Sequence, residues 1–211
     1  MGNKSRTKGE NRYLCAMKNI VFDLGGVLFA RDKRKCTPEF IDFFKFIRTD
    51  PMPDFWIEYD RGTLTLDQVT DALCRLNGAT REQSEKYLQT AIDRQEPVKA
   101  TEELVRDLKA AGYKLYVLSN MSREFIGFLR RVPVYGCFDG EVVSCEEHTV
   151  KPERRIYEIL LDRFGLDPAE TLFIDDRAAN IDAARCLGID GYRFDPHDPA
   201  ASCGELRRML L

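Results

Sequence analysis

Apolar and polar positions divide the chain into short apolar runs and longer stretches in which apolar residues recur every three or four positions. The short runs are bounded by turn residues, which is typical of buried strands; they are residues 20–22, 115–118, 172–174 and 192–194. The longer stretches predict helices; those between the later runs begin at Thr101, Pro152 and Asp176 and end at Gly112, Gly165 and Gly188. Strands that alternate with helices predict an α/β fold with a doubly wound, Rossmann-like parallel sheet.

The alternation stops between residues 34 and 98, where the pattern is helical throughout. Thr37 precedes Pro38 as a helix N-cap does, and two further threonines stand three positions before a glutamine, Thr65 before Gln68 and Thr80 before Gln83. We therefore expect a small helical cap, residues 34–98, inserted after the first strand. The α/β core is then residues 17–33 and 99–211, and residues 1–16 form a polar N-terminal tail.

Aromatic residues within this insert are expected to pack rather than to bind substrate. Trp56 and Tyr59 are three positions apart, which is the spacing of side chains on one face of a helix.

Composition excludes several classes of partner. The 211 residues carry 32 Lys and Arg against 35 Asp and Glu, mixed along the chain, which gives a net charge of −3 and no field that would attract nucleic acid or a membrane surface. The seven cysteines contain no C-x-x-C pair, and no apolar run approaches the length of a membrane span. We expect a cytoplasmic protein with a small-molecule partner; the sequence leaves the oligomeric state unknown.

Polar residues follow three of the predicted strands. Asp23 follows the first strand, Ser119 and Asn120 follow the second, and Asp175 and Asp176 follow the third. Because ligands of open parallel sheets bind beyond the carboxyl ends of the strands, these residues are expected to share one crevice. Three carboxylates in one place repel one another unless a cation lies between them, and oxygen ligands favour Mg²⁺.

Lys151 supplies a charge of the opposite sign. It precedes Pro152 at a predicted helix start, where the helix dipole disfavours a cation, so it needs an anionic partner. With Ser119 and the backbone N–H of Asn120, it is suited to binding a phosphate group.

Four motifs in this order resemble those of the haloacid dehalogenase superfamily of Mg²⁺-dependent phosphatases. They are "VFDLGGVL", "VLSN", "KPERRIYE" and "LFIDDRAANIDAARCLG", and the similarity extends from residue 17 to about residue 195. Within the superfamily, the chain looks most like the subgroup of α-D-glucose-1-phosphate phosphatase and the phosphatase domain of soluble epoxide hydrolase. The resemblance implies that the insert is a mobile cap over the substrate.

The resemblance also implies roles for the residues at the strand ends. Asp23 would be the nucleophile that forms an aspartyl phosphate, while Ser119 and Lys151 would hold the phosphoryl group. The metal would be held by Asp23, Asp176 and the carbonyl of Gly25, with Asp175 and Asn180 close by.

One position departs from the phosphatase pattern. The superfamily usually has a second Asp two residues after the nucleophile, as proton donor and base, whereas this chain has Gly25. Its absence favours a substrate with a good leaving group, such as a sugar 1-phosphate, or slow turnover.

Two alternatives to a phosphatase remain open. A 2-haloacid dehalogenase uses the same nucleophile without a metal, but such a site would bury the charges of Asp175 and Asp176 unpaired. A relative of low activity that only binds a phosphorylated ligand is compatible with Gly25.

Overall fold

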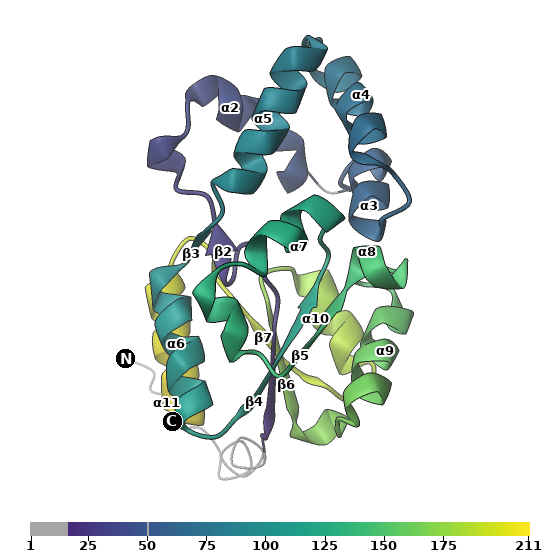
Figure 1. Cartoon of the computed structure of the whole chain (residues 1–211). Helices are drawn as coiled ribbons and strands as arrows, with labels where there is room; N and C mark the ends of the chain where they lie inside the picture. The colour runs from purple at the N-terminus through teal and green to yellow at the C-terminus, as the bar shows by residue number, and fades with distance from the viewer. Residues whose placement is uncertain (1–16, 50) are drawn as a thin grey trace, which may run out of the picture.

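A five-stranded parallel sheet forms the centre of the protein (Figure 1). The computed structural model describes residues 17–49 and 51–211, so the predicted tail at residues 1–16 lies outside the described residues. The strand order is β5-β4-β1-β6-β7. The strands are β1 (Asn19–Phe22), β4 (Lys114–Ser119), β5 (Gly140–Val143), β6 (Thr171–Asp175) and β7 (Asp190–Arg193). The predicted doubly wound α/β fold is therefore confirmed.

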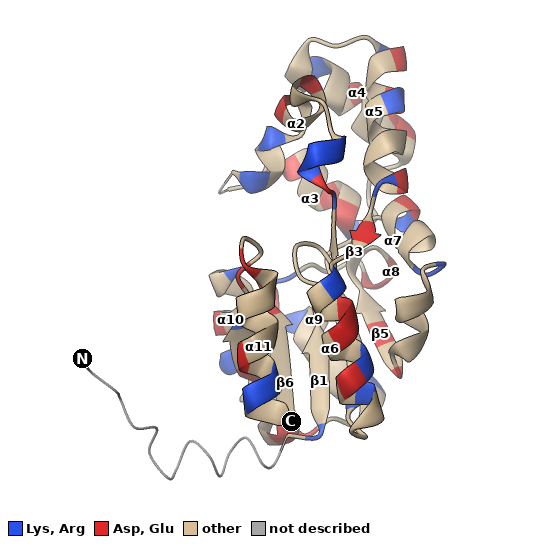
Figure 2. Cartoon of the chain, turned by 90° about the vertical axis from the view of Figure 1, so that its left-hand side faces the viewer, with Lys and Arg blue, Asp and Glu red and all other residues tan. Residues whose placement is uncertain are grey.

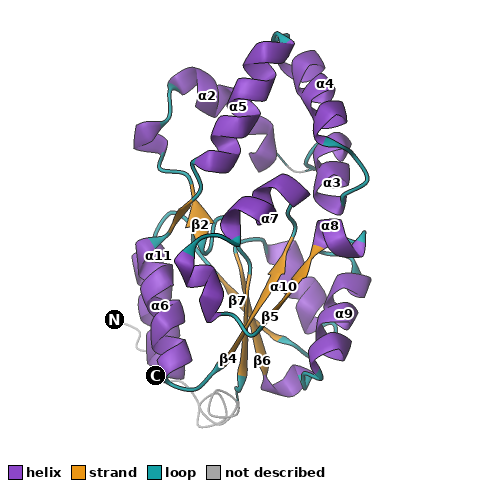
Figure 3. Cartoon of the chain, viewed as in Figure 1, coloured by secondary structure: helices purple, strands orange, loops and turns teal. Residues whose placement is uncertain are grey.

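Helices cover both faces of the sheet (Figure 3). Alternate residues of β1 point to opposite faces: Ile20 and Phe22 pack in the cluster that includes residues of α6 and α11, whereas Val21 packs in the cluster formed with α9 and α10. The helices of the core are α6 (Lys99–Ala110), α7 (Arg123–Leu129), α8 (Ser144–Glu147), α9 (Arg154–Phe164), α10 (Ala178–Arg185) and α11 (Pro199–Leu210).

Three predicted helix starts were wrong by two residues, including that at Asp176, because α10 begins at Ala178. The helix α6 begins at Lys99 with Val98 as its N-cap, and Thr101 is a buried residue of its first turn whose hydroxyl contacts the Cys203 thiol at 3.7 Å. The helix α9 begins at Arg154 rather than at Pro152. Thr101 is buried by tertiary packing instead of capping the helix. The sequence alone does not distinguish a threonine that caps a helix from one that is buried in its first turn.

The α-helices of residues 34–98 lie beyond the carboxyl ends of the central strands (Figure 1). They are α2 (Pro38–Phe43), α3 (Asp54–Arg61), α4 (Leu66–Asn77) and α5 (Arg81–Asp93). Trp56 and Tyr59 are buried in the hydrophobic cluster of this segment, as their spacing predicted. Thr65 forms the expected capping box, and the Thr80 hydroxyl accepts the Gln83 N–H. We call residues 34–98 the cap; its mobility stays a prediction.

The chain passes twice between core and cap through adjacent strands. These are β2 (Phe29–Ala30) and β3 (Glu96–Pro97), which pair antiparallel. Acidic and basic residues are interspersed over the outer faces of both parts (Figure 2). No helix in residues 17–49 and 51–211 combines the length and apolarity needed to cross a membrane.

Candidate active site

The sheet register places the predicted polar residues side by side. Phe22 of β1 is level with Val117 of β4 and with Ile174 of β6, so the residues that follow these three positions emerge together. The Asp23 N–H donates to the Ile174 carbonyl at 2.9 Å, which fixes Asp23 against the end of β6. This edge is where the strand order reverses around β1, the usual ligand position of such sheets.

Lys151 lies at the centre of the cluster. Its ammonium nitrogen is 2.8 Å from Asp23 Oδ1 and 2.7 Å from Asp175 Oδ2, and it donates to the Leu118 carbonyl at 2.9 Å. Ser119, which is fully buried, donates its hydroxyl to the same Asp23 Oδ1 at 2.9 Å. The structure thus brings Asp23, Ser119 and Lys151 into direct contact.

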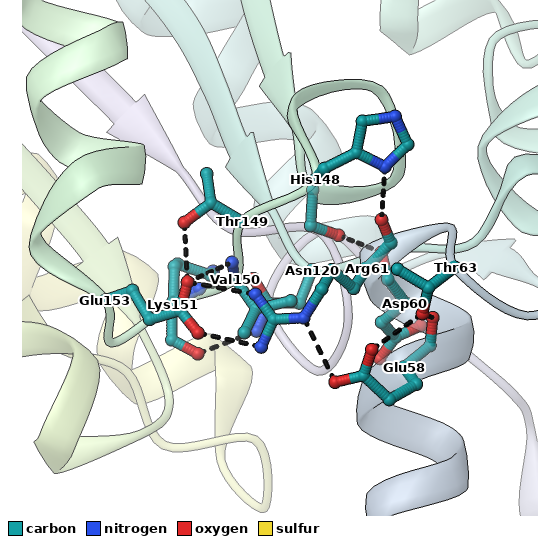
Figure 4. Close-up of polar contacts among 11 residues, drawn as sticks. Glu58, Asp60, Arg61, Thr63, Asn120, His148, Thr149, Val150, Lys151 and Glu153 are labelled. Carbon is teal, nitrogen blue, oxygen red and sulfur yellow. Dashed lines mark hydrogen bonds and ion pairs between the residues drawn. The ribbon is translucent and has the colours of Figure 1, made fainter.

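Asn120 holds the loop that carries Lys151. Its side-chain amide donates to the Lys151 carbonyl at 2.9 Å, and its side-chain oxygen accepts the Lys151 N–H at 2.7 Å (Figure 4). This reciprocal pair joins the end of β4 to a loop 31 residues later in the chain. The side chain of Asn120 therefore positions Lys151, a role that the sequence did not reveal.

Burial and the neighbouring charges shift the pKa values of Lys151 and Asp23. Burial lowers the pKa of Lys151, but the Asp175 and Asp23 carboxylates beside it outweigh burial and raise that pKa above its ordinary value. Burial raises the pKa of Asp23, which Lys151 lowers and Asp175 raises further. The ammonium is consequently held charged between two carboxylates.

Asp175 uses both of its oxygens inside the protein. Oδ1 accepts the Arg177 N–H at 2.8 Å and the Asn180 side-chain amide at 3.0 Å, and Oδ2 accepts the same amide at 3.0 Å and the Lys151 ammonium at 2.7 Å. Asn180 and Asp175 are both buried, and the nitrogen of Asn180 faces Asp175. This arrangement orients the carboxylate behind the site.

Asp176 contrasts with its neighbour. It is partly exposed and accepts no hydrogen bond from the described residues, 17–49 and 51–211. Burial, followed by the charges of Asp23 and Asp175, raises the pKa of Asp176 to about 7. A Cβ at Gly26, which has φ of +81°, would lie 2.9 Å from Asp176 Oδ2, so the glycine gives this carboxylate its room.

The oxygen donors at this point suit a hard divalent cation. Asp23, Asp175 and Asp176 offer oxygens that all lie within 4.8 Å of one another, and a single ammonium, that of Lys151, is bonded to two of these carboxylates. Three carboxylates facing one cation leave negative charge uncompensated, and carboxylate and carbonyl oxygens are the ligands of Mg²⁺. Asp23 and Asp176, with the exposed Gly25 beside them, fit such an ion.

A carboxylate of the cap lies close enough to interact with the same cluster, and the sequence analysis missed it. Asp60, in the last turn of α3, interacts electrostatically with Asp23, Lys151 and Arg177. Arg177 also donates to the Ile47 carbonyl of the cap at 3.2 Å. No local pattern marks Asp60, because its position depends on how the cap lies on the core.

The match to known families agrees with the motifs. Residues 17–188 match the model of the haloacid dehalogenase-like hydrolases. The chain belongs to this family. The family predicted from the four motifs is therefore confirmed, and the protein is an enzyme of this hydrolase family.

The relatives of this chain include phosphatases and a dehalogenase. A sesquiterpene phosphatase of Aspergillus oryzae is 28% identical over 92% of this chain and 96% of its own length. A D-ribitol-5-phosphate phosphatase of Bacteroides thetaiotaomicron is 26% identical over 92% of this chain and 98% of its own length. An (S)-2-haloacid dehalogenase of Burkholderia cepacia is 27% identical, but over 67% of this chain and 59% of that enzyme.

A solved structure that aligns with most of this chain has a similar fold. It is a wild-type haloacid dehalogenase family enzyme of Bacteroides thetaiotaomicron in complex with magnesium and inorganic phosphate. It superposes with a TM-score of 0.66 and 25% identity, and the alignment covers 85% of this chain and 95% of that one.

Proposed function

We propose that this protein is a Mg²⁺-dependent phosphatase that hydrolyses a small phosphorylated metabolite of the sugar 1-phosphate kind through an aspartyl phosphate on Asp23. The observation that carries the proposal is the contact of Lys151 with Asp23 and Asp175, beside an Asp176 carboxylate that no described donor satisfies. One ammonium and one dication together balance the charge of three carboxylates, so a phosphate group can approach without net repulsion. The phosphatase relatives and the magnesium and phosphate complex of the structural neighbour support the same reading.

Each residue of the cluster has a defined part in this reaction. Asp23 Oδ1 accepts from Ser119 and Lys151, so the carboxylate is held with Oδ2 directed to the phosphorus. The Ser119 hydroxyl and the Lys151 ammonium then share their hydrogen bonds with the phosphoryl oxygens. When bound by Asp23, Asp176 and the Gly25 carbonyl, Mg²⁺ supplies neutralisation of the phosphoryl charge. Asp175 and Asn180 keep Lys151 in place.

The leaving group decides the substrate class. Gly25 puts no carboxyl next to the nucleophile, which favours substrates whose leaving oxygen needs little help from a proton donor. An anomeric oxygen is a better leaving group than a primary alcohol, and this preference is why we name sugar 1-phosphates rather than phosphorylated primary alcohols.

The test is hydrolysis of p-nitrophenyl phosphate and of a panel of sugar phosphates, with Mg²⁺ and with a chelator. We expect Mg²⁺-dependent release of phosphate by the wild type and none by Asp23→Asn; Asp182→Asn, an exposed carboxylate on α10, serves as the matched control. Release of chloride from (S)-2-chloropropionate without metal would instead identify a dehalogenase. Stoichiometric phosphate binding with no trapped phosphoenzyme would identify a ligand-binding relative.

A further inference from the structure

The end of α3 is fixed to the core on both sides of Asp60. The Tyr59 hydroxyl donates to Glu124 at 2.7 Å. The Arg61 guanidinium forms two bonds to Glu153, at 3.0 and 2.7 Å (Figure 4). A Cβ at Gly62, which has φ of +78°, would lie 2.5 Å from the Cys145 carbonyl, so α3 ends directly against α8. These contacts join the cap to the core at three positions within residues 59–62.

The backbone of Asp60 is linked through Ser144 to Met121, a residue close to Gly25. The Ser144 hydroxyl donates to the Asp60 carbonyl and accepts the Met121 N–H at 2.9 Å, so the backbones of Asp60 and Met121 are hydrogen-bonded to the same hydroxyl group. The Met121 Cε is in turn 4.0 Å from where a Cβ of Gly25 would be. Asp60 is therefore anchored beside Met121, which is the nearest neighbour of a side chain at residue 25, and its carboxylate interacts electrostatically with Asp23 and Lys151.

The surroundings of Asp60 favour its protonated form. Burial raises the pKa of Asp60 well above its ordinary value; Arg177 lowers it, Asp23 raises it, and the Ser122 N–H and Lys151 lower it to a smaller extent. A carboxyl whose pKa is raised keeps its proton to higher pH than an ordinary carboxyl and can donate that proton to a leaving group.

We propose that Asp60 is the general acid and general base of this enzyme, supplying from the cap the carboxyl that Gly25 does not provide. This inference rests on the proposed phosphatase function. As the Asp23 oxygen bonds to phosphorus and the bond to the leaving oxygen breaks, the Asp60 carboxyl gives its proton to that oxygen, which departs as an alcohol. The Asp60 carboxylate then takes a proton from water as the water oxygen bonds to phosphorus, which releases phosphate and restores the Asp23 carboxylate.

The experiment compares Asp60→Asn with Glu58→Gln on two substrates, glycerol 3-phosphate and p-nitrophenyl phosphate. Glu58 lies on the same helix and accepts hydrogen bonds from Arg61 at 3.1 Å and Thr63 at 2.6 Å, so Glu58→Gln reports the effect of perturbing α3 alone.

For Asp60→Asn we expect kcat/KM to fall by about 10² or more with glycerol 3-phosphate and by less than about tenfold with p-nitrophenyl phosphate. Phosphoenzyme should accumulate with the aryl substrate, a signal that requires a folded variant. Glu58→Gln should keep the wild-type ratio of the two rates.

A second variant separates proton transfer from structure. Adding Gly25→Asp to Asp60→Asn should restore turnover of glycerol 3-phosphate, because a new carboxyl then stands beside the nucleophile. An unchanged substrate ratio in Asp60→Asn, an equal loss on both substrates, or a failure of Gly25→Asp to rescue would overturn the role of Asp60 while the phosphatase function stands. A wild type that hydrolyses neither substrate with Mg²⁺ would overturn both proposals.

Discussion

At the scale of single residues, Asp176 carries an unfavourable charge that a metal ion would relieve. Its pKa of about 7 lies above the ordinary 3.8, so the metal-free folded protein retains a proton that the unfolded chain releases. The stability that this group contributes is complete below pH 3.8 and is lost as the pH rises through about 7.

Replacement of Asp176 by Asn should therefore stabilise the metal-free protein at pH 8. The melting temperature should rise by about 2–4 °C for each kcal/mol of repulsion relieved, and the gain should shrink toward pH 5. Mg²⁺ should raise the melting temperature of the wild type more at pH 8 than at pH 6 and leave the variant unchanged. Thermal melts with and without Mg²⁺ measure both effects. An equal Mg²⁺ shift in variant and wild type would contradict Asp176 as a ligand.

Gly25 offers a second test at this scale. The nearest atom to a Cβ at this position is Met121 Cε at 4.0 Å, and Gly25 is exposed, so an aspartate fits without strain. In the Asp60→Asn background, Gly25→Asp should increase the rate on glycerol 3-phosphate relative to glucose 1-phosphate by about tenfold or more, because the poorer leaving group gains more from an added acid. The ratio of kcat/KM values is the measurement, and an unchanged ratio would refute the leaving-group argument.

The sequence predicted which candidate site residues lie together at the strand ends and missed the contacts that depend on tertiary placement. Asp23, Ser119 and Asp175 were found because parallel strands end at one edge, and the register indeed brings them together. The positioning role of the Asn120 side chain and the approach of Asp60 depend on contacts with loops more than 30 residues away in the chain. No pattern within a strand or a helix encodes such contacts.

At the scale of secondary-structure elements, β5 shows why one core strand was not predicted. Only four residues long, it begins at Gly140, a residue type depleted in strands. Close packing requires a glycine at this position, because a Cβ would lie 2.4 Å from Cε1 of the Phe164 ring on α9. The strands with longer apolar runs were recognised, because their hydrophobicity alone indicated burial on both faces.

Gly140→Ala should therefore destabilise the fold by about 1–3 kcal/mol, since the methyl group must displace a ring at the join of β5 and α9. Gly136→Ala is the matched control, because a Cβ at Gly136 meets nothing within 4 Å. Urea unfolding curves compare the two variants. Equal midpoints would show that the ring moves aside freely and that the packing explanation is wrong.

At the scale of the whole molecule, the helices of residues 34–98 and the α/β alternation of the rest could be predicted, whereas the contact between these parts could not. Capping residues such as Thr65 and the burial of Trp56 are local properties of the insert. The paired linkers β2 and β3, and the docking of α3 on α8, join segments far apart in the sequence. The cluster at the strand ends belongs to the core, but access to it depends on the cap.

The Arg61–Glu153 ion pair is the contact through which salt should act on cap closure. Both side chains are partly exposed, at 20% and 43%, so the attraction is weak and screened by ions. Arg61→Gln should raise KM for p-nitrophenyl phosphate about two- to fivefold, the size of an exposed pair. NaCl at about 0.5 M should raise KM of the wild type similarly and add little in the variant. Arg81→Gln is the control, because Arg81 is paired within the cap to Asp71 and Glu85. An additional salt effect of full size in Arg61→Gln would show that other charges govern closure.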